Sequence, residues 1–160
     1  MGEASTPKAT IVVPVYNSAS SIQRCLDSLL AQSERLIQVV CVNDGSADDS
    51  LCVLRQIAQI DDRVLVIDQK NAGVSCARNA GIDAAEGCVV FFVDADDYID
   101  AQTVERVLQA MGSSDAEVAV FGGVCEPADA APKRVQQLMS PNAGTLGTRD
   151  PQLLFHANAQ

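Results

Sequence analysis

Short runs of aliphatic and β-branched residues recur through residues 1–120, and segments with helical periodicity lie between them. The runs are nearly continuous in apolar residues rather than alternating, which is typical of strands buried on both faces of a parallel sheet. The predicted strands are Ala9–Val15, Ile37–Val42, Val64–Ile67, Val89–Val93 and Val118–Phe121.

The segments between these runs repeat apolar residues on one helical face. Ile22–Leu30 and Val104–Met111 both show apolar side chains three to four residues apart. The segment Val74–Glu86 differs, because its helical face consists of Ala and Gly, which let a helix lie close to a sheet. Repeated strand-then-helix order predicts right-handed crossovers. We therefore expect an α/β fold with a mostly parallel sheet and helices on both faces.

The pattern changes after Gly123. An Ala-, Pro- and Asp-rich stretch follows, and the pair Asp150–Pro151 predicts the start of a short helix that carries Leu153–Phe155. We divide the chain into an α/β core, residues 1–122, and a second region, residues 123–160.

Composition narrows the classes of function. The 160 residues carry 21 Asp and Glu against 11 Lys and Arg, a formal net charge of −10. This acid excess argues against nucleic acid or an anionic membrane as a partner, since both need clustered basic residues. No apolar run approaches the roughly 20 residues of a membrane span, and the first ten residues lack the apolar stretch of a signal peptide. We expect a cytoplasmic domain without a transmembrane segment.

The six cysteines do not indicate a metal or disulfide site. They form no CxxC pair, and the single histidine, His156, has no metal-ligand spacing to any of them. Cys25, Cys41 and Cys88 fall within apolar patterns and are expected to be small buried hydrophobes.

Polar residues follow four of the predicted strands at the point where each strand ends. Open α/β sheets bind ligands outside the carboxyl ends of their strands, so these four segments are candidate site loops. They are Pro14–Asn17, Asn43–Ser46, Asp68–Asn71 and Asp94–Asp97.

The pair Asp94 and Asp96 is the most informative of these polar groups. Two carboxylates so close after a buried strand repel each other unless a cation neutralises them. Mg²⁺ and similar hard ions take carboxylate oxygens and are commonly completed by substrate phosphates. The chain lacks the GxGxxG and GxxxxGK[ST] phosphate loops, so metal and nearby cations such as Lys70 and Arg78 would have to hold a diphosphate.

Four segments, in order and spacing, resemble the signatures of family 2 glycosyltransferases, which have a GT-A fold. The resemblance covers about residues 9–122. The segments are Ala9–Asn17 (ATIVVPVYN), Val39–Ser50 (VVCVNDGSADDS), Lys70–Ile82 (KNAGVSCARNAGI) and Phe91–Asp100 (FFVDADDYID).

The resemblance implies a role for individual residues. Pro14, Val15 and Tyr16 would contact the nucleobase, with Tyr16 able to stack on it. Asp44 would hydrogen-bond the base edge, Arg78 would lie near the base or diphosphate, and Asp94 and Ala95 would meet the nucleotide. Asp96, with Asp94, would hold Mn²⁺ or Mg²⁺, while Lys70 and Gly73 would shape the loop.

The implied reaction is inverting transfer of a sugar from a nucleotide-diphosphate donor, with UDP favoured, to a glycan or lipid-linked acceptor in surface polysaccharide or cell-wall synthesis. In this family the general base and the acceptor-binding elements follow well after the paired aspartates. No residue among Glu126, Asp129 and Asp150 is assigned as the base, so the catalytic residue stays unknown. We expect the chain to be the donor-binding portion of a longer enzyme, inactive by itself.

Two alternatives remain open from the sequence. One is a nucleotide-sugar-binding module without catalysis. The other is a haloacid-dehalogenase-like phosphatase, although Tyr98 stands where that family has Thr or Val, and its paired aspartates come near the start of the fold.

Overall fold

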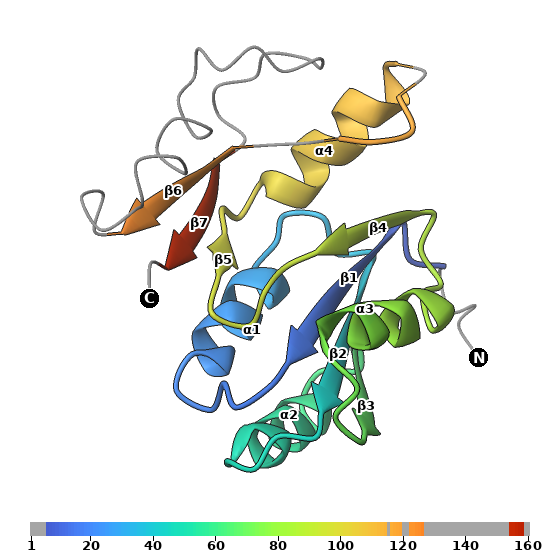
Figure 1. The fold of residues 1–160 in the computed structure, drawn as a ribbon. Coiled ribbons are helices and arrows are strands. Elements are labelled where there is room, and N and C mark those ends of the chain that lie inside the picture. Colours follow the sequence, from blue (N-terminus) through green and yellow to red (C-terminus); the bar gives the residue numbers. More distant parts are fainter. Residues whose placement is uncertain (1–5, 115, 120–121, 127–153, 159–160) are drawn as a thin grey trace.

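The computed structural model describes residues 6–114, 116–119, 122–126 and 154–158. Four parallel strands form the main sheet, in the order β3-β2-β1-β4 (Figure 1). They are β1 (Ala9–Val15), β2 (Ile37–Asp44), β3 (Val64–Gln69) and β4 (Val89–Phe92).

The order of the strands creates a reversal next to β1. The chain runs outward from β1 through β2 to β3 and then returns to the other side of β1 to form β4. The connection from β3 to β4 thus passes back over β2 and β1, and such a reversal in an open α/β sheet is where ligands bind, at the carboxyl ends of the strands. This reversal determines where a ligand can enter the fold.

The four predicted strands up to residue 93 are confirmed, with small differences at their ends. β2 continues to Asp44 because Asn43 and Asp44 still pair with Asp68 and Gln69 of β3. The central strands β1 and β2 are almost wholly buried, whereas β3 and β4 at the edges are partly exposed. Burial on both faces explains why the central runs are continuous in apolar residues.

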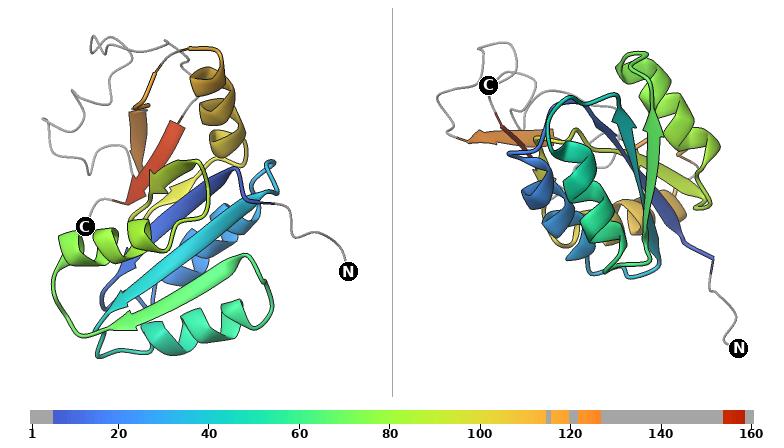
Figure 2. Two further views of the ribbon diagram at one scale, coloured as in Figure 1. Left: turned by 90° about the vertical axis from the view of Figure 1, so that its right-hand side faces the viewer. Right: turned by 90° about the horizontal axis from the view of Figure 1, so that it is seen from below.

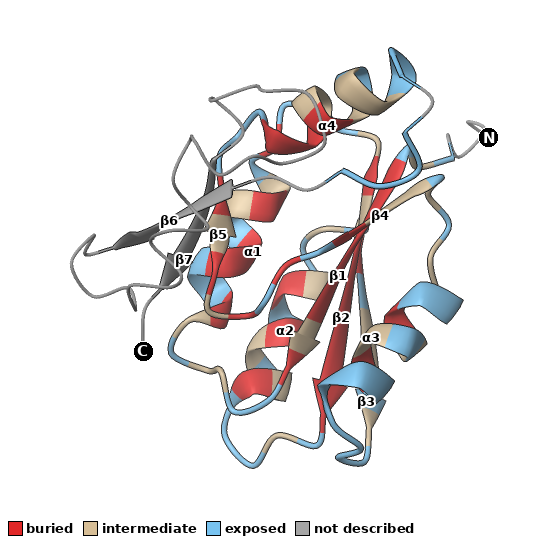
Figure 3. Ribbon diagram, turned by 45° about the horizontal axis from the view of Figure 1, so that its top comes forward, coloured by how far each residue is buried: buried red, intermediate tan, exposed pale blue. Residues whose placement is uncertain are grey.

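Helices cover both faces of the sheet, as the sequence predicts (Figure 2). The helices are α1 (Ile22–Leu30), α2 (Ser50–Ala58), α3 (Val74–Asp83) and α4 (Thr103–Gly112). Apolar residues of α1, α2 and α4 join one core cluster with the sheet, and α3 covers the opposite face, where Ala77 packs on Val40 and Val42. Buried residues follow β1, β2 and the inner faces of α1 and α2 (Figure 3).

The small residues of α3 allow a close approach to β1. A Cβ atom added at Gly81 would lie 2.2 Å from Cγ1 of the fully buried Val12. Such a distance is far inside van der Waals contact, so α3 can occupy this position only with glycine there.

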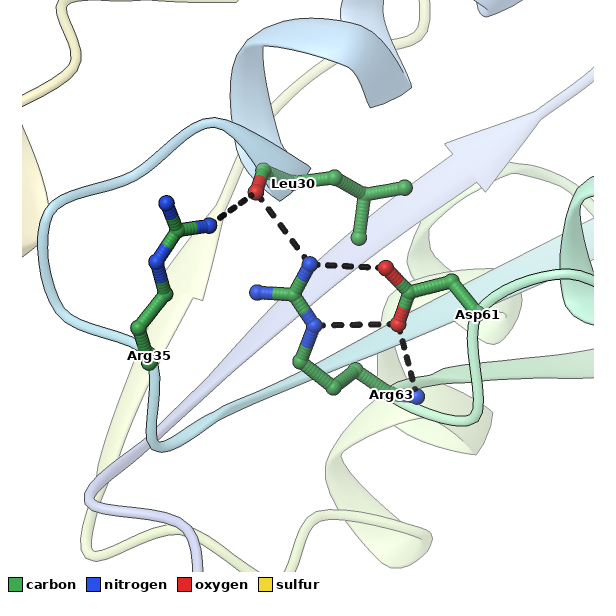
Figure 4. Close-up of polar contacts among 4 residues, drawn as sticks. All are labelled: Leu30, Arg35, Asp61 and Arg63. Carbon is green, nitrogen blue, oxygen red and sulfur yellow. Dashed lines mark hydrogen bonds and ion pairs between the residues drawn. The ribbon is translucent and has the colours of Figure 1, made fainter.

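Two arginine side chains stabilise the carboxyl end of α1 (Figure 4). Leu30, the last residue of α1, has a backbone carbonyl that accepts hydrogen bonds from Arg35 Nη1 and Arg63 Nη2, each at 3.2 Å. Arg63 also forms two side-chain hydrogen bonds with Asp61, at 2.9 and 2.7 Å. Positive charge here complements the negative end of the helix dipole and ties α1 to the start of β3.

A second sheet forms beside α1. It has the order β5-β7-β6, with β5 (Tyr98–Ile99) antiparallel to β7 (Leu154–Asn158) and β6 (Gly122–Glu126) parallel to β7. No helix in the described ranges is long and apolar enough to cross a membrane.

Two predictions about the later part of the chain are wrong. Val118 and Ala119 are not in a strand, because pairing begins only at Gly122, opposite Leu154. Leu154 and Phe155 belong to a strand rather than a helix, since Leu154 pairs with Gly122 of β6 and Phe155 pairs with both Gly123 of β6 and Ile99 of β5. The predicted helix start at Asp150–Pro151 lies outside the described residues.

The cysteines follow the prediction except at one position. Cys25 and Cys41 are buried, and burial raises the pKa of Cys41 to about 12, so its thiol stays neutral. Cys88, by contrast, is exposed, because it precedes β4 in the turn after α3.

Candidate functional site

A pocket of about 470 Å³ lies at the carboxyl ends of β1, β2 and β4. It occupies the reversal in strand order described above. Its lining includes every residue that the sequence analysis assigned to the nucleotide or metal: Pro14, Val15, Tyr16, Asp44, Arg78, Asp94, Ala95 and Asp96. The structure thus brings these side chains together at one site.

The Asp44 carboxylate of the pocket accepts three hydrogen bonds. Its Oδ1 accepts from Gln69 Nε2 and from the backbone N–H of Ala72, and its Oδ2 accepts from the backbone N–H of Gly73, all at 2.8 Å. The hydrogen bond from Gln69, aided by the two backbone donors, lowers the pKa of Asp44 against the opposing effect of burial. Asp44 is therefore ionised at neutral pH and holds the turn that leads into α3.

The turn that Asp44 holds depends on glycine. Gly73 is the N-cap of α3 and has φ 89° and ψ 158°, a region that is essentially closed to residues with a Cβ. This conformation directs Val74 and Ala77, in the first turn of α3, into the lining of the pocket.

The loop after β1 is tied to the loop after β2 by hydrogen bonds in both directions. Asn17, at φ 50°, accepts the backbone N–H of Ala47 at 2.8 Å through Oδ1, and its own N–H donates to Ser46 Oγ at 3.0 Å. Ala19 N–H donates to Asp48 Oδ2 at 3.0 Å. These bonds hold the backbone beside Tyr16, whose ring is 54% exposed at the pocket.

Arg78 and Asp94 form an ion pair across the pocket. Arg78 Nη2 lies 2.8 Å from Asp94 Oδ1, joining α3 to the loop after β4. Arg78 Nε is buried and has no hydrogen-bond partner among the described residues. The Nη2 group of Arg78 thus binds Asp94 and fixes the Asp94 side chain in the lining of the pocket.

The acidic residues of the pocket suit a metal ion whose coordination is completed by a bound ligand rather than by protein side chains alone. Asp94 and Asp96 both line the pocket. No group of three or more His, Cys, Asp or Glu side chains suited to a metal occurs in the part of the chain that the structure describes. Two carboxylates with an open side are the arrangement in which Mg²⁺ and related ions bind phosphate-containing substrates.

Two pocket residues, Val74 and Ala77, were not found from the sequence, whereas Asn71 belongs to the candidate site loop Asp68–Asn71. Val74 and Ala77 were interpreted only as part of a helix, and their position three residues apart in its first turn was the signal that both face one site. Gly73, a lesser candidate, lines the pocket as well, whereas Lys70 does not belong to its lining.

Comparison with known proteins identifies the family. The family model of glycosyl transferase family 2 matches residues 10–158. The chain belongs to this family. Membership confirms the resemblance seen in the four segments and removes the support for a phosphatase.

Curated relatives are glycosyltransferases and are much longer than this chain. Glycosyltransferase GlyA of Streptococcus pneumoniae is 42% identical over 113 residues, which are 71% of this chain and 16% of GlyA. Chondroitin synthase of Pasteurella multocida is 37% identical over 103 residues, 64% of this chain and 11% of the synthase. The chain thus spans only a small part of these relatives.

Solved structures show the same fold. Residues 1–349 of S. aureus TarS in complex with UDP-GlcNAc are 30% identical, with a TM-score of 0.69, over 74% of this chain and 35% of that chain. A mannosyltransferase from Pyrobaculum calidifontis, in complex with GDP-Man and Mn²⁺, is 24% identical, with a TM-score of 0.63, over 76% of this chain and 36% of that chain. The expected GT-A fold is confirmed.

Proposed function

We propose that the pocket binds the nucleoside diphosphate of an activated sugar, with uridine diphosphate as the preferred nucleotide. The observation that carries this proposal is the meeting of an exposed aromatic ring, Tyr16, with the carboxylates of Asp44, Asp94 and Asp96 at one reversal of the sheet. The structures of S. aureus TarS with UDP and with UDP-GlcNAc support a uridine nucleotide.

The base would lie between the loops after β1 and β2. Tyr16 offers a ring for stacking, beside Pro14 and Val15. Asp44 is already occupied by three donors, but Oδ2 accepts only one of the hydrogen bonds described and has a second lone pair for an N–H of the base. Uracil presents such an N–H group, as guanine does, so the choice of uracil rests on the structures of S. aureus TarS with UDP and UDP-GlcNAc.

The ribose and diphosphate would extend toward the loop after β4. Arg78 holds Asp94 in place through their ion pair, so the free oxygen of Asp94 is oriented for a ribose hydroxyl. Asp96, with Asp94, would hold Mn²⁺ or Mg²⁺ together with the diphosphate. That ion would neutralise the negative charge that develops on the departing nucleotide.

We further propose that residues 1–122 serve as the donor-binding part of an inverting transferase that builds a surface polysaccharide or cell-wall glycan. The relatedness to chondroitin synthase and GlyA supports a polysaccharide or glycan product. The acceptor-binding elements and the general base are assigned to no residue of this chain. By itself the chain is expected to bind donor with little or no sugar transfer.

Isothermal titration calorimetry tests the donor site. Residues 1–160 should bind UDP more tightly than GDP, and Mn²⁺ should strengthen UDP binding. Asp96→Ala should abolish the effect of Mn²⁺ while the protein stays folded by circular dichroism. A UDP affinity that changes neither with Mn²⁺ nor with the Asp96→Ala substitution would contradict the assigned metal role.

A further inference from the structure

The segment that carries Asp94 and Asp96 lies across one side of α1. Just after β4, the Val93 N–H donates a backbone hydrogen bond to the Val12 carbonyl of β1 at 3.1 Å. Apart from the ion pair between Arg78 of α3 and Asp94, side chains of α1 and of Gln32, just after its C-cap, bind the backbone of the segment at its start, middle and end. Residues 94–104 are therefore held from one side by α1 and the residues just after it, in addition to the pairing of β5 with β7.

Three polar side chains, two on α1 and one just after it, form hydrogen bonds with the segment and are spaced three and four residues apart. They are Cys25, Ser28 and Gln32. Cys25 Sγ donates to the Asp94 carbonyl at 3.6 Å, a distance suited to sulfur. Ser28 Oγ accepts the Ile99 N–H at 3.2 Å and donates to the Cys25 carbonyl at 2.7 Å. Cys25 and Ser28 thus lie next to each other on one face of α1 and both bind the segment.

Gln32 completes the row and is fully buried. Its Nε2 donates to the Asp100 carbonyl at 2.7 Å and to the Ser28 carbonyl at 3.1 Å, and its Oε1 accepts the Val104 N–H at 3.0 Å. A buried amide with all these partners is costly to displace, because each group left unpaired would lose its hydrogen bond without gaining water. Gln32 therefore fixes where the segment ends and α4 begins.

We propose that Cys25, Ser28 and Gln32 are positioning residues for the carboxylates of Asp94 and Asp96, and that they set how much a divalent metal strengthens nucleotide binding. The inference rests on the proposed donor site. Its physical basis is that a metal shared between two carboxylates and a diphosphate requires the two side chains at fixed places, whereas stacking of the base on Tyr16 does not. Loosening the segment should weaken the metal-dependent part of binding and leave the metal-independent part unchanged.

Calorimetry with UDP, with and without Mn²⁺, measures this effect as the ratio of the two dissociation constants. Ser28→Ala removes the acceptor for Ile99 while favouring the helix, and Gln32→Met keeps the shape of the side chain but removes its hydrogen bonds. In both variants we expect the Mn²⁺ enhancement to fall about tenfold, the lower end of the range for groups that support metal ligands. Ser28→Thr, which keeps the hydroxyl, and Gln23→Ala, on an exposed face of α1, should keep the wild-type enhancement.

The two levels of the proposal fail in different ways. If Ser28→Ala and Gln32→Met are folded and keep the full Mn²⁺ enhancement, the positioning role is wrong, although the donor site can stand. If Mn²⁺ does not strengthen UDP binding by the wild-type protein, or if Asp96→Ala keeps the full effect of Mn²⁺, the metal role of the donor site is wrong. The positioning role is then overturned with it. Loss of metal-free UDP affinity in Ser28→Ala also contradicts the proposal, because it would indicate general damage to the pocket.

Discussion

The carboxylate of Asp44, at the end of β2, accepts the backbone N–H of Gly73 at 2.8 Å, and this bond fixes where α3 begins. Gly73 in turn adopts a backbone conformation that only glycine occupies readily. The buried carboxylate of Asp44 thus binds an N–H group that only the glycine backbone conformation brings into position.

Replacing Asp44 by Asn tests this match. The amide keeps the size of the side chain but presents an NH₂ group to backbone donors, so at least one of the three hydrogen bonds is lost. Hydrogen bonds to a charged group contribute about 1.5–3 kcal/mol each, so we expect a loss of that order in the free energy of unfolding by urea. Asp49→Asn is a matched control, since the Asp49 side chain makes no capping hydrogen bond. Equal stability of both variants would show that the Asp44 bonds contribute nothing.

Gly81→Ala should destabilise the fold even though alanine favours helices. The added Cβ would lie 2.2 Å from Val12 Cγ1, so α3 must move away from β1. Overpacking of this kind costs about 1–3 kcal/mol, which exceeds the intrinsic gain of about 1 kcal/mol. Gly112→Ala, at the end of α4, is the control, because an added Cβ there meets nothing within 4 Å among the described residues. Urea denaturation should show a loss for the first variant and none for the second.

The parts of the fold that sequence predicted correctly are those in which local pattern and tertiary environment agree. β1 and β2 are apolar throughout because both their faces are covered, and the small residues of α3 lie against Val12 and Val40 as expected. Val118 and Leu154 were misassigned because their state depends on pairing between β6 and β7, which are distant in sequence. Local propensity carries no information about such pairing.

The site was predictable in its residues but not in its connections. Motifs after each strand placed Tyr16, Asp44 and Asp96 at one edge of the sheet, and all three line the pocket. That Asp44 would be used mainly by the turn before α3 could not be inferred, since its donors are mostly backbone N–H groups. Backbone donors carry no residue signature, so only the folded geometry reveals them.

The Asp61–Arg63 pair should make stability depend on pH. The hydrogen bonds from Arg63 hold the pKa of Asp61 below its ordinary value of 3.8. A carboxyl with a lowered pKa in the folded state stabilises the protein above its unfolded pKa, and this contribution disappears as the pH falls through the folded value. Arg63→Met should therefore cost about 2 kcal/mol at pH 7 and less near pH 3, as measured by urea denaturation at both pH values.

Arg35→Met serves as the comparison for that experiment. Arg35 donates to the same Leu30 carbonyl but is exposed, and its charge is the smallest of the effects that lower the pKa of Asp61 (Figure 4). Its loss should change stability by about 0.5 kcal/mol or less, with little dependence on pH. A cost for Arg63→Met that is the same at both pH values would show that the pair with Asp61 does not stabilise the fold.

Tyr16 provides the sharpest test of where the nucleobase lies. Its ring is 54% exposed at the pocket, so removing it should weaken binding without changing the stability of the fold. Stacking of a base on an aromatic ring contributes about 1–3 kcal/mol, so Tyr16→Ala should weaken UDP binding about fivefold or more in calorimetry. Tyr16→Phe keeps the ring and should bind nearly as wild type. Ile60→Ala, which removes an exposed apolar side chain after α2, should leave affinity unchanged. Unaltered UDP binding by Tyr16→Ala, together with a loss in Asp96→Ala, would place the diphosphate in the pocket and the base elsewhere.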